Sequence, residues 1–423
     1  MTLKNPYRPG RYVTGPQFYG RQDILHTLEH ADYRGAYIIG TRQMGKTSLL
    51  REMERQLLAF YVDVSYMGHD LSRWAKHLQR SVDRKRPTYD WLPDATATVA
   101  ADFFDLLEQV AHAAGDNNQK VWLLLDEAED LMSMEEAQPG FLARLRGATE
   151  MLPVLRLTLA GYRSLLELRE AIPPHYLSPL LGGFISFVLP PLSAAEATAL
   201  ICQEKMSPSI QVEEAVVKQI LAEADGHPFL LQRLCNALWK EGMLQPPDET
   251  ILHRISADAE NVFPADFELL SDVEQQVLLG LSQQKEATFA EIETILTGKS
   301  YHFSKSLQDL VDLGFLSRTS IGYAISSRVL VGWLASRKDS GEMPTPISDP
   351  AVIELHSADE QENRLEELLR IHRDNLHHYE KIKAQYGFDV PLHVISGLEY
   401  EKEAIQGLQK DLETLRGTEE QEE

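Results

Sequence analysis

The stretch that decides the fold of this chain is Ala36-Tyr37-Ile38-Ile39-Gly40-Thr41-Arg42-Gln43-Met44-Gly45-Lys46-Thr47. Its last eight residues follow the pattern G-x-x-x-x-G-K-[ST], directly after a short apolar run that predicts a β-strand. Gly40 and Gly45 let the backbone curl so that successive N–H groups point into one concavity, and a helix beginning near Thr47 adds its positive end. The sequence therefore predicts a site for the phosphates of a nucleoside triphosphate.

Each residue type in this loop has an expected task. Lys46 would reach the β and γ phosphates, and the Thr47 hydroxyl would hold Mg²⁺. ATP or ADP with Mg²⁺ is the expected cofactor set. The residues expected to line the nucleotide are Gly40, Thr41, Arg42, Gln43, Met44, Gly45, Lys46, Thr47 and Ser48.

A second apolar run, Val121 to Leu125, ends in the two carboxylates Asp126 and Glu127. In a parallel sheet the carboxyl end of this strand lies at the same edge as the phosphate loop. Asp126 is placed to hold Mg²⁺ through water, and Glu127 to polarise an attacking water. An aspartate alone would suit a switch, whereas the Asp-Glu pair suits hydrolysis.

Arg163 follows the next apolar strand, Leu155 to Ala160. Its guanidinium would emerge at the edge that carries Asp126, and could form forked bonds to γ-phosphate oxygens. The alternative is a solvated surface charge, which is common just past a strand.

On these motifs the chain resembles P-loop ATPases of the additional-strand class, and within them the STAND and archaeal-type AAA-like group. Asn5-Pro6-Tyr7 and Phe18-Tyr19-Gly20-Arg21 look like the loop that such ATPases fold around the adenine, and Gly226-His227-Pro228 matches the G-x-P of the STAND helical lid. The resemblance implies that Tyr19, Arg21 and Pro228 lie near the nucleotide, and that the lid moves when ATP replaces ADP. It also implies that the strand ending at Ala160 lies between the phosphate-loop strand and the Asp126 strand.

Related oligomeric ATPases carry an arginine finger and often an arginine in the lid. Arg144, Arg146 and Arg156 lie in the stretch where a finger is expected, and Arg233 is the candidate in the lid. Neither role can be assigned from the sequence.

The pattern along the chain predicts an α/β fold with a parallel sheet covered by helices on both faces. Strands are expected at 36–39, 59–64, 121–125, 155–160 and 184–189, and Ser193 is expected to cap a helix with Glu196 at its third position. The expected domains are a P-loop ATPase core at 1–192, a helical lid at 193–260, a winged helix at 261–338, a linker at 339–360 and a helical hairpin at 361–416.

The winged-helix prediction rests on helical patterns at 273–281, 289–296 and 303–313, followed by strand patterns at 314–318 and 323–326. In a DNA-binding version Lys299, His302 and Lys305 would face the major groove. The net charge of −23 argues against a phosphate backbone as partner, so a module that packs on the ATPase or binds protein is favoured.

The acidic tail carries two amphipathic patterns, around 365–382 and 398–415. Their apolar stripes must be buried against something, which favours a protein partner or self-association. His372, His377 and His378 are expected to be surface residues and not metal ligands.

Composition sets the remaining bounds. The sequence has no apolar stretch long enough for a membrane helix and no signal-peptide core at its start, so a cytoplasmic protein is expected. Cys202 and Cys235 lie in apolar helical patterns and are expected to be free thiols.

The expected function is an ATP-binding and hydrolysing signalling switch of STAND type that changes conformation or assembly state and recruits protein partners. One alternative is a nucleic-acid-associated ATPase of origin-recognition type that uses the winged helix. The other is a nucleotide-binding scaffold without significant turnover.

Overall fold

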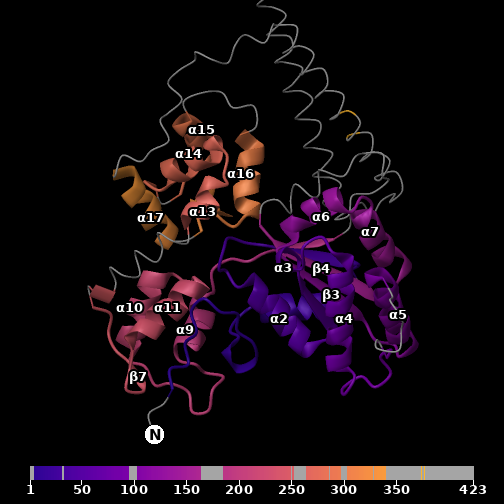
Figure 1. Cartoon of the computed structure of the whole chain (residues 1–423). Helices are drawn as coiled ribbons and strands as arrows, with labels where there is room; N and C mark the ends of the chain where they lie inside the picture. The colour runs from indigo at the N-terminus through magenta and orange to yellow at the C-terminus, as the bar shows by residue number, and fades with distance from the viewer. Residues whose placement is uncertain are drawn as a thin grey trace, which may run out of the picture. The chain divides into compact units, whose positions relative to one another are not determined.

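The computed structural model of the 423-residue chain describes residues 4–30, 33–94, 102–162, 184–248, 250–251, 263–284, 286–296, 303–326 and 328–339, with 373 and 376. The chain divides into two compact units, residues 1–343 and 344–423. Every element below belongs to the first unit (Figure 1). Arg163, Lys299, His302 and the three tail histidines lie outside the described residues, as does the predicted hairpin at 361–416 apart from residues 373 and 376.

A parallel sheet organises the amino-terminal half of this unit. Its strands are β1 (Gly35–Ile39), β2 (Ala59–Asp63), β3 (Val121–Asp126), β4 (Leu155–Gly161) and β5 (Ile185–Val188), in the order β2-β3-β4-β1-β5. All neighbouring pairs are parallel, and β4 lies between β1 and β3. The predicted α/β fold and the predicted place of the strand ending at Ala160 are thus confirmed.

Strand ends differ from the prediction by at most one residue. β2 stops at Asp63 because the Asp63 side chain accepts the N–H of Tyr66 at 2.9 Å and begins the short helix α3 (Val64–Met67). β3 continues to Asp126, whose backbone still pairs with Asp63. The pairing therefore holds the first acidic residue rigidly in the strand.

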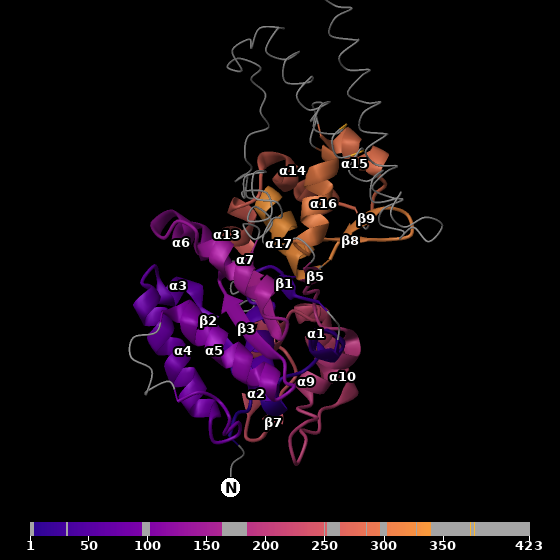
Figure 2. The same cartoon turned by 90° about the vertical axis from the view of Figure 1, so that its right-hand side faces the viewer.

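Helices cover both faces of the sheet (Figures 1 and 2). One face packs against α1 (Gln22–His30) and α2 (Lys46–Gln56), and the other against α4 (Leu71–Lys85), α5 (Phe103–Asp116) and α7 (Phe141–Met151). Alternate residues of one strand enter the two cores: Ile38 belongs to the core that contains Leu49, and Ile39 to the core that contains Phe103. Burial on both faces explains the nearly continuous apolar strands.

Two short elements follow β3, namely η2 (Ala128–Asp130) and α6 (Leu131–Ala137), while η1 (Gly15–Gln17) precedes α1. The elements η2 and α6 connect the acidic end of β3 to α7. The element η1 lies in the segment that leads into the sheet.

A three-helix segment follows β5, with its own apolar core. It contains α9 (Ala194–Ile201), α10 (Glu214–Ala224) and α11 (Pro228–Leu238). The predicted cap is confirmed, since Ser193 and Glu196 form a reciprocal capping box at the start of α9. The two-residue strands β6 (Trp239–Lys240) and β7 (Met243–Leu244) then pair antiparallel, which the sequence did not predict.

We call residues 263–339 the C-terminal module. It contains α13 (Phe263–Glu268), α14 (Asp272–Leu281), α15 (Phe289–Ile295), α16 (Phe303–Asp312), β8 (Leu316–Arg318), β9 (Tyr323–Ile325) and α17 (Arg328–Asp339). β8 and β9 form an antiparallel hairpin. The three helices and two strands that the sequence predicted are present, while α13 and α17 are additional.

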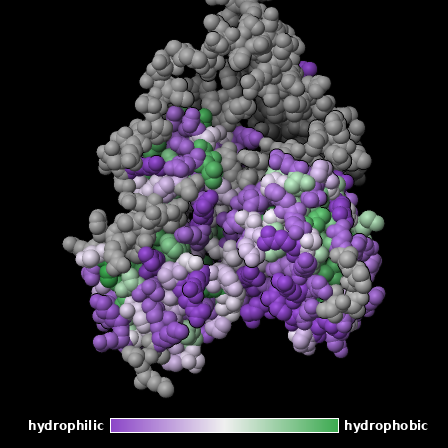
Figure 3. Space-filling view, viewed as in Figure 1, coloured by the Kyte–Doolittle hydropathy of each residue, from purple (hydrophilic) through white to green (hydrophobic). Residues whose placement is uncertain are grey.

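Polar side chains dominate the described surface in Figure 3, with apolar residues in scattered spots. Among the described helices, none has the length and hydropathy needed to cross a bilayer.

Candidate functional site

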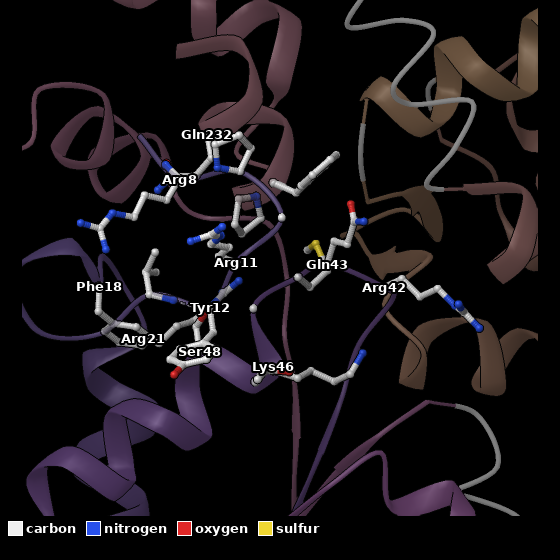
Figure 4. Close-up of a pocket in the computed structure, with 18 of the residues that line it drawn as sticks. Arg8, Arg11, Tyr12, Phe18, Arg21, Arg42, Gln43, Lys46, Ser48 and Gln232 are labelled. Carbon is white, nitrogen blue, oxygen red and sulfur yellow. Dashed lines mark hydrogen bonds between the residues drawn. The ribbon is translucent and has the colours of Figure 1, made fainter. Parts of the chain in front are cut away.

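A cavity of about 700 Å³ lies above the phosphate loop (Figure 4), within the usual range for small-molecule sites. The loop, the amino-terminal segment before α1, the acidic end of β3 and the start of α11 all contribute to its wall. Among the residues predicted to bind nucleotide or catalyse, the cavity is lined by Tyr19, Arg21, Arg42, Gln43, Met44, Gly45, Lys46, Thr47, Ser48, Glu127 and Pro228. Four segments far apart in sequence therefore meet at this cavity, while Gly40, Thr41 and Asp126 are not among the residues that line it.

The phosphate loop owes its shape to Gly45 and Lys46. Gly45 precedes α2 with φ +94°, a left-handed conformation that favours glycine. The Lys46 ammonium donates to the carbonyl oxygens of Gly40 at 2.7 Å and Thr41 at 3.1 Å, so these two residues support the lysine. Burial lowers the pKa of Lys46, and the carboxylates around it oppose that shift.

Asp126 lies behind the cavity wall, buried at the end of β3. Its Oδ2 accepts the hydroxyl proton of Tyr61 from β2 at 2.8 Å, and the Arg51 guanidinium lies 3.4 Å from the centroid of the Tyr61 ring. The carboxylate is therefore fixed from the neighbouring strand. Neither Tyr61 nor Arg51 was predicted, and no sequence motif identifies them.

Glu127 leaves the strand in the left-handed region, with φ +50° and ψ +47°, which turns its side chain to the cavity. Burial, together with the nearby Glu129 and Asp126 carboxylates, raises the pKa of Glu127 to about 7. Glu129 also lines the cavity and accepts the backbone N–H of Tyr162 at 3.3 Å. A carboxyl group with a pKa near neutrality suits proton transfer at physiological pH.

The Thr47 hydroxyl and the Asp126 carboxylate are hard oxygen ligands of the kind that Mg²⁺ prefers. The described residues contain no cluster of three or more His, Cys, Asp or Glu able to hold a metal ion by themselves. This donor set fits a cation that keeps several waters and shares phosphate oxygens with its nucleotide.

The amino-terminal segment is held between α2 and α11. The Ser48 hydroxyl accepts the N–H of Val13 at 3.1 Å, and the Glu52 carboxylate accepts that of Gly15 at 2.7 Å. From the other side, Gln232 accepts the N–H of Arg8 at 2.9 Å. Ser48 thus contacts the segment as well as the cavity, and Glu52 and Gln232 are positioning residues that sequence reasoning missed.

Tyr19 and Arg21 line the cavity, but their polar groups form hydrogen bonds with residues that do not line it. The Tyr19 hydroxyl accepts the N–H of Lys205 at 3.2 Å. Arg21 is buried, donates its N–H to Glu196 at 3.1 Å and its guanidinium to the Pro190 carbonyl. Burial lowers the pKa of Arg21. Their hydrogen bonds join the cavity wall to the start of α9, through Arg21, and to the residues after its end, through Tyr19.

The Gly226-His227-Pro228 motif lies at the turn before α11. Gly226 has φ +75°, and its carbonyl accepts the N–H of Leu192 at 2.8 Å. Pro228 is the first residue of α11 and lines the cavity. His227 is fully buried, and neither ring nitrogen has a hydrogen-bond partner in the structure.

The predicted finger candidates have intramolecular contacts. Arg144 pairs with Asp102, and Arg146 lies 3.6 Å from Glu150. Arg156 is buried in β4 and donates to the carbonyls of Pro153 and Leu155, so it cannot reach a neighbouring subunit. That candidate is wrong, because the strand turns the side chain into the fold. Arg233 is exposed on α11 and does not line the cavity.

A carboxylate that the sequence did not predict reaches the phosphate loop from the C-terminal module. Asp266 Oδ2 accepts the backbone N–H of Arg42 at 2.7 Å, and Oδ1 lies 3.1 Å from Arg42 Nε. Burial raises the pKa of Asp266, while Arg42 and Lys46 oppose the shift. Nothing in the surrounding sequence marks Asp266 as part of a motif.

No protein-family model and no curated protein matches the chain. Among solved structures, it is similar to the Walker-type ATPase PABY2304 of Pyrococcus abyssi, with a TM-score of 0.58 and 17% identity over 78% of this chain and 98% of that one. The Aeropyrum pernix ORC2 protein, in ADPNP–ADP complexes, gives a TM-score of 0.42 and 14% identity over 77% and 97% of the two chains. The RuvB Holliday junction branch migration motor of Thermotoga maritima gives 0.35 and 15% over 77% and 95%. The parallel sheet, the phosphate loop and the likeness to the Pyrococcus ATPase together show that this chain has the P-loop NTPase fold.

Proposed function

We propose that the protein binds ATP with Mg²⁺ and hydrolyses it to ADP and phosphate. The observation that carries the proposal is the convergence of Lys46, Thr47 and Glu127 on one cavity, with Asp126 fixed behind them. A pure scaffold needs the phosphate loop alone. The acid at the cavity wall, with its pKa near neutrality, supports turnover.

In the proposed reaction the backbone N–H groups of the loop and Lys46 bind the β and γ phosphates. Bound Mg²⁺ would neutralise charge on the phosphate oxygens. Glu127 accepts a proton from the attacking water, whose oxygen bonds to the γ phosphorus as the bond to the ADP oxygen breaks. Asp126, which its bond to Tyr61 holds in place, would supply a carboxylate to the cation.

We infer that the nucleotide controls the position of neighbouring parts of the chain. Pro228 of α11 and Leu269 of the C-terminal module both line the cavity, so a change in nucleotide acts on both. This supports a switch in which α9–α11 serve as a lid and the C-terminal module as a winged helix. The tail at 361–416 is then the expected site of self-association or of a protein partner.

A nucleic-acid-associated ATPase is the second candidate. It is considered because the similar structures include the ORC2 protein and a branch migration motor. The charge of −23 favours a protein partner instead, and the described side chains of α16 include one basic residue, Lys305, and the acidic Asp309. The two candidates share the ATPase and differ in what it acts on.

Phosphate release and light scattering test the ATPase and the switch together. We expect Mg²⁺-dependent release from the native chain, no nucleotide binding by Lys46→Ala, and binding without release by Glu127→Gln. Growth of the particle with ATP that persists in Glu127→Gln would support the assembly switch. Steady turnover by an unchanged monomer would reject it.

Fluorescence anisotropy with duplex and single-stranded DNA separates the two candidates. A nucleic-acid ATPase should bind with an affinity that falls steeply with salt, and Lys305→Ala should weaken binding while Lys240→Ala, exposed on β6, should not. No binding at 50 mM salt with either nucleotide would exclude the nucleic-acid candidate.

A further inference from the structure

Asp266 connects the C-terminal module to the backbone and to a side chain of the phosphate loop. It lies on α13, its side chain is 0% exposed, and its Oδ2 accepts the backbone N–H of Arg42 at 2.7 Å. Arg42 is the third residue of the loop, and its side chain extends from the loop towards the C-terminal module (Figure 4). A carboxylate oxygen thus accepts a hydrogen bond from a backbone N–H of the loop. Backbone N–H groups of such loops are the groups that bind phosphate.

The same carboxylate influences Lys46. Among the charged groups that favour protonated Lys46, Asp266 has the largest effect, ahead of Glu127, Glu129 and Asp126. Asp266 therefore offers negative charge both to a loop N–H and to the lysine expected to reach the γ phosphate. Asp266 does not itself line the cavity, so its negative charge would act on a terminal phosphate across the backbone of the phosphate loop.

We propose that Asp266 sets the nucleotide preference of the site, so that the chain with α13 docked on the loop accepts ADP and disfavours ATP. The inference rests on the proposed function and names the residue that couples it to the C-terminal module. ATP would bring the γ-phosphate charge close to a buried carboxylate, and like charges repel strongly where water is excluded. ADP lacks that phosphate and leaves the contact intact.

Other contacts of α13 show what its displacement would change. Tyr162, directly after β4, donates its hydroxyl to the Asp266 carbonyl at 3.0 Å. The Phe263 ring packs edge-on against His227 with centroids 6.0 Å apart, next to Pro228. One short helix thus contacts the phosphate loop, the end of β4 and the start of α11. Release of Asp266 by ATP would loosen all three contacts at once.

Docking of α13 and the choice between ADP and ATP are thermodynamically linked, so the two nucleotide affinities report on the docking. If docking of α13 favours ADP over ATP, then removing the carboxylate must shift the ratio of the two affinities. We would compete ADP and ATP against a fluorescent nucleotide on full-length chains carrying Glu127→Gln, so that ATP persists. The variant is Asp266→Asn, and the matched control is Glu268→Gln, an exposed carboxylate on the same helix.

We expect Asp266→Asn to shift the affinity ratio towards ATP by about tenfold or more, as loss of a buried like charge requires. Glu268→Gln should leave the ratio unchanged. An unchanged ratio in a folded Asp266→Asn chain would overturn the proposal, even if nucleotide still binds and the native chain still hydrolyses ATP. Failure of every chain to bind nucleotide would instead reject the proposed function on which it rests.

Amide hydrogen exchange in the chain with native Asp266 provides a second test that does not depend on the variant folding. Peptides covering residues 263–270 should exchange faster with ATP than with ADP when Glu127→Gln prevents turnover. Equal protection in the two states would overturn the proposal.

Discussion

Single residues at this site depend on partners from other elements. Asp126 ends β3, but its orientation comes from the hydroxyl of Tyr61 on β2, and Arg51 of α2 packs on that ring. A partner that orients a metal ligand typically affects metal affinity without touching the metal. The Asp-Glu pair supplies the chemistry, and the neighbouring strand supplies its geometry.

Replacement of Tyr61 by Phe should raise the Mg²⁺ concentration for half-maximal ATPase activity by about tenfold, because Asp126 loses the bond that orients it. Titration of phosphate release with Mg²⁺ measures the effect. Tyr37→Phe is the matched control, since Tyr37 is a buried strand tyrosine whose hydroxyl makes no hydrogen bond to the described residues. Equal Mg²⁺ dependence in the two variants would show that Tyr61 only fills space.

Glu127 should cause the fall of ATPase activity on the acidic side of the pH–rate profile. With a pKa of about 7 in the free protein, Glu127 is protonated below that pH and cannot accept a proton from water. We expect kcat/KM to fall about tenfold per pH unit below 7 and to level off above it. Initial rates between pH 5.5 and 8.5 test this. A profile that is flat across neutrality would assign the proton transfer to another group.

At the scale of elements, close backbone approach joins β5 to α11. A Cβ added at Gly226 would lie 2.2 Å from the Leu192 carbonyl oxygen, and Gly226 has φ +75°. Both observations demand glycine, because the contact is with backbone that cannot rotate away. The turn places Pro228 at the cavity, so its geometry affects the site as well as stability.

Gly226→Ala should destabilise the chain by about 3 kcal/mol through strain and overpacking. Gly147→Ala is the control, because Gly147 lies inside α7 with no atom within 4 Å of an added Cβ, and a helical alanine should stabilise by up to about 1 kcal/mol. Urea unfolding compares them. Equal urea midpoints for the two variants would mean that the backbone at Leu192 shifts to accommodate the added methyl group without cost.

At the scale of the whole first unit, the C-terminal module is packed into the same apolar core as one face of the sheet. Phe263 and Phe267 of α13 belong to the cluster that contains Phe103 and Leu123. His227 packs on Phe263 with unbonded ring nitrogens, and burial lowers the pKa of His227 to about 4. Protonation therefore opposes folding of this region.

The sign of the pH effect follows from the two states. Above pH 6.5 His227 is neutral in both the folded and the unfolded chain. Between pH 6.5 and 4 only the unfolded chain binds the proton, so stability falls as pH falls. The free energy of unfolding should drop by about 2 kcal/mol between pH 7 and 5 from this residue.

Urea unfolding at both pH values, in the native chain and in His227→Leu, isolates the contribution. We expect the variant to lose about 2 kcal/mol less on acidification. His112→Leu, a change at a mostly exposed histidine, should behave like the native chain. The prediction fails if both variants show the native loss.

Sequence patterns were sufficient to predict those features that depend on residues close together in the chain. The phosphate loop requires two glycines, a lysine and a threonine at fixed spacing, and buried parallel strands require continuous apolar runs. The Ser193–Glu196 cap is equally local, and all these predictions placed their elements correctly. The strand at 59–64 was one residue too long, because Asp63 caps a helix that the apolar pattern hides.

The sequence by itself determined that this protein has a P-loop sheet with an acidic strand end beside a phosphate-binding loop. Those features depend on residue types and spacings a few positions apart. Only the tertiary structure decided that Tyr61 orients Asp126, that Arg156 points into the fold, and that Asp266 reaches the Arg42 N–H across 224 positions. The physical reason is that a single buried carboxylate or hydroxyl gains its role from the partner that chain packing brings to it, and a partner that distant leaves no periodic signal.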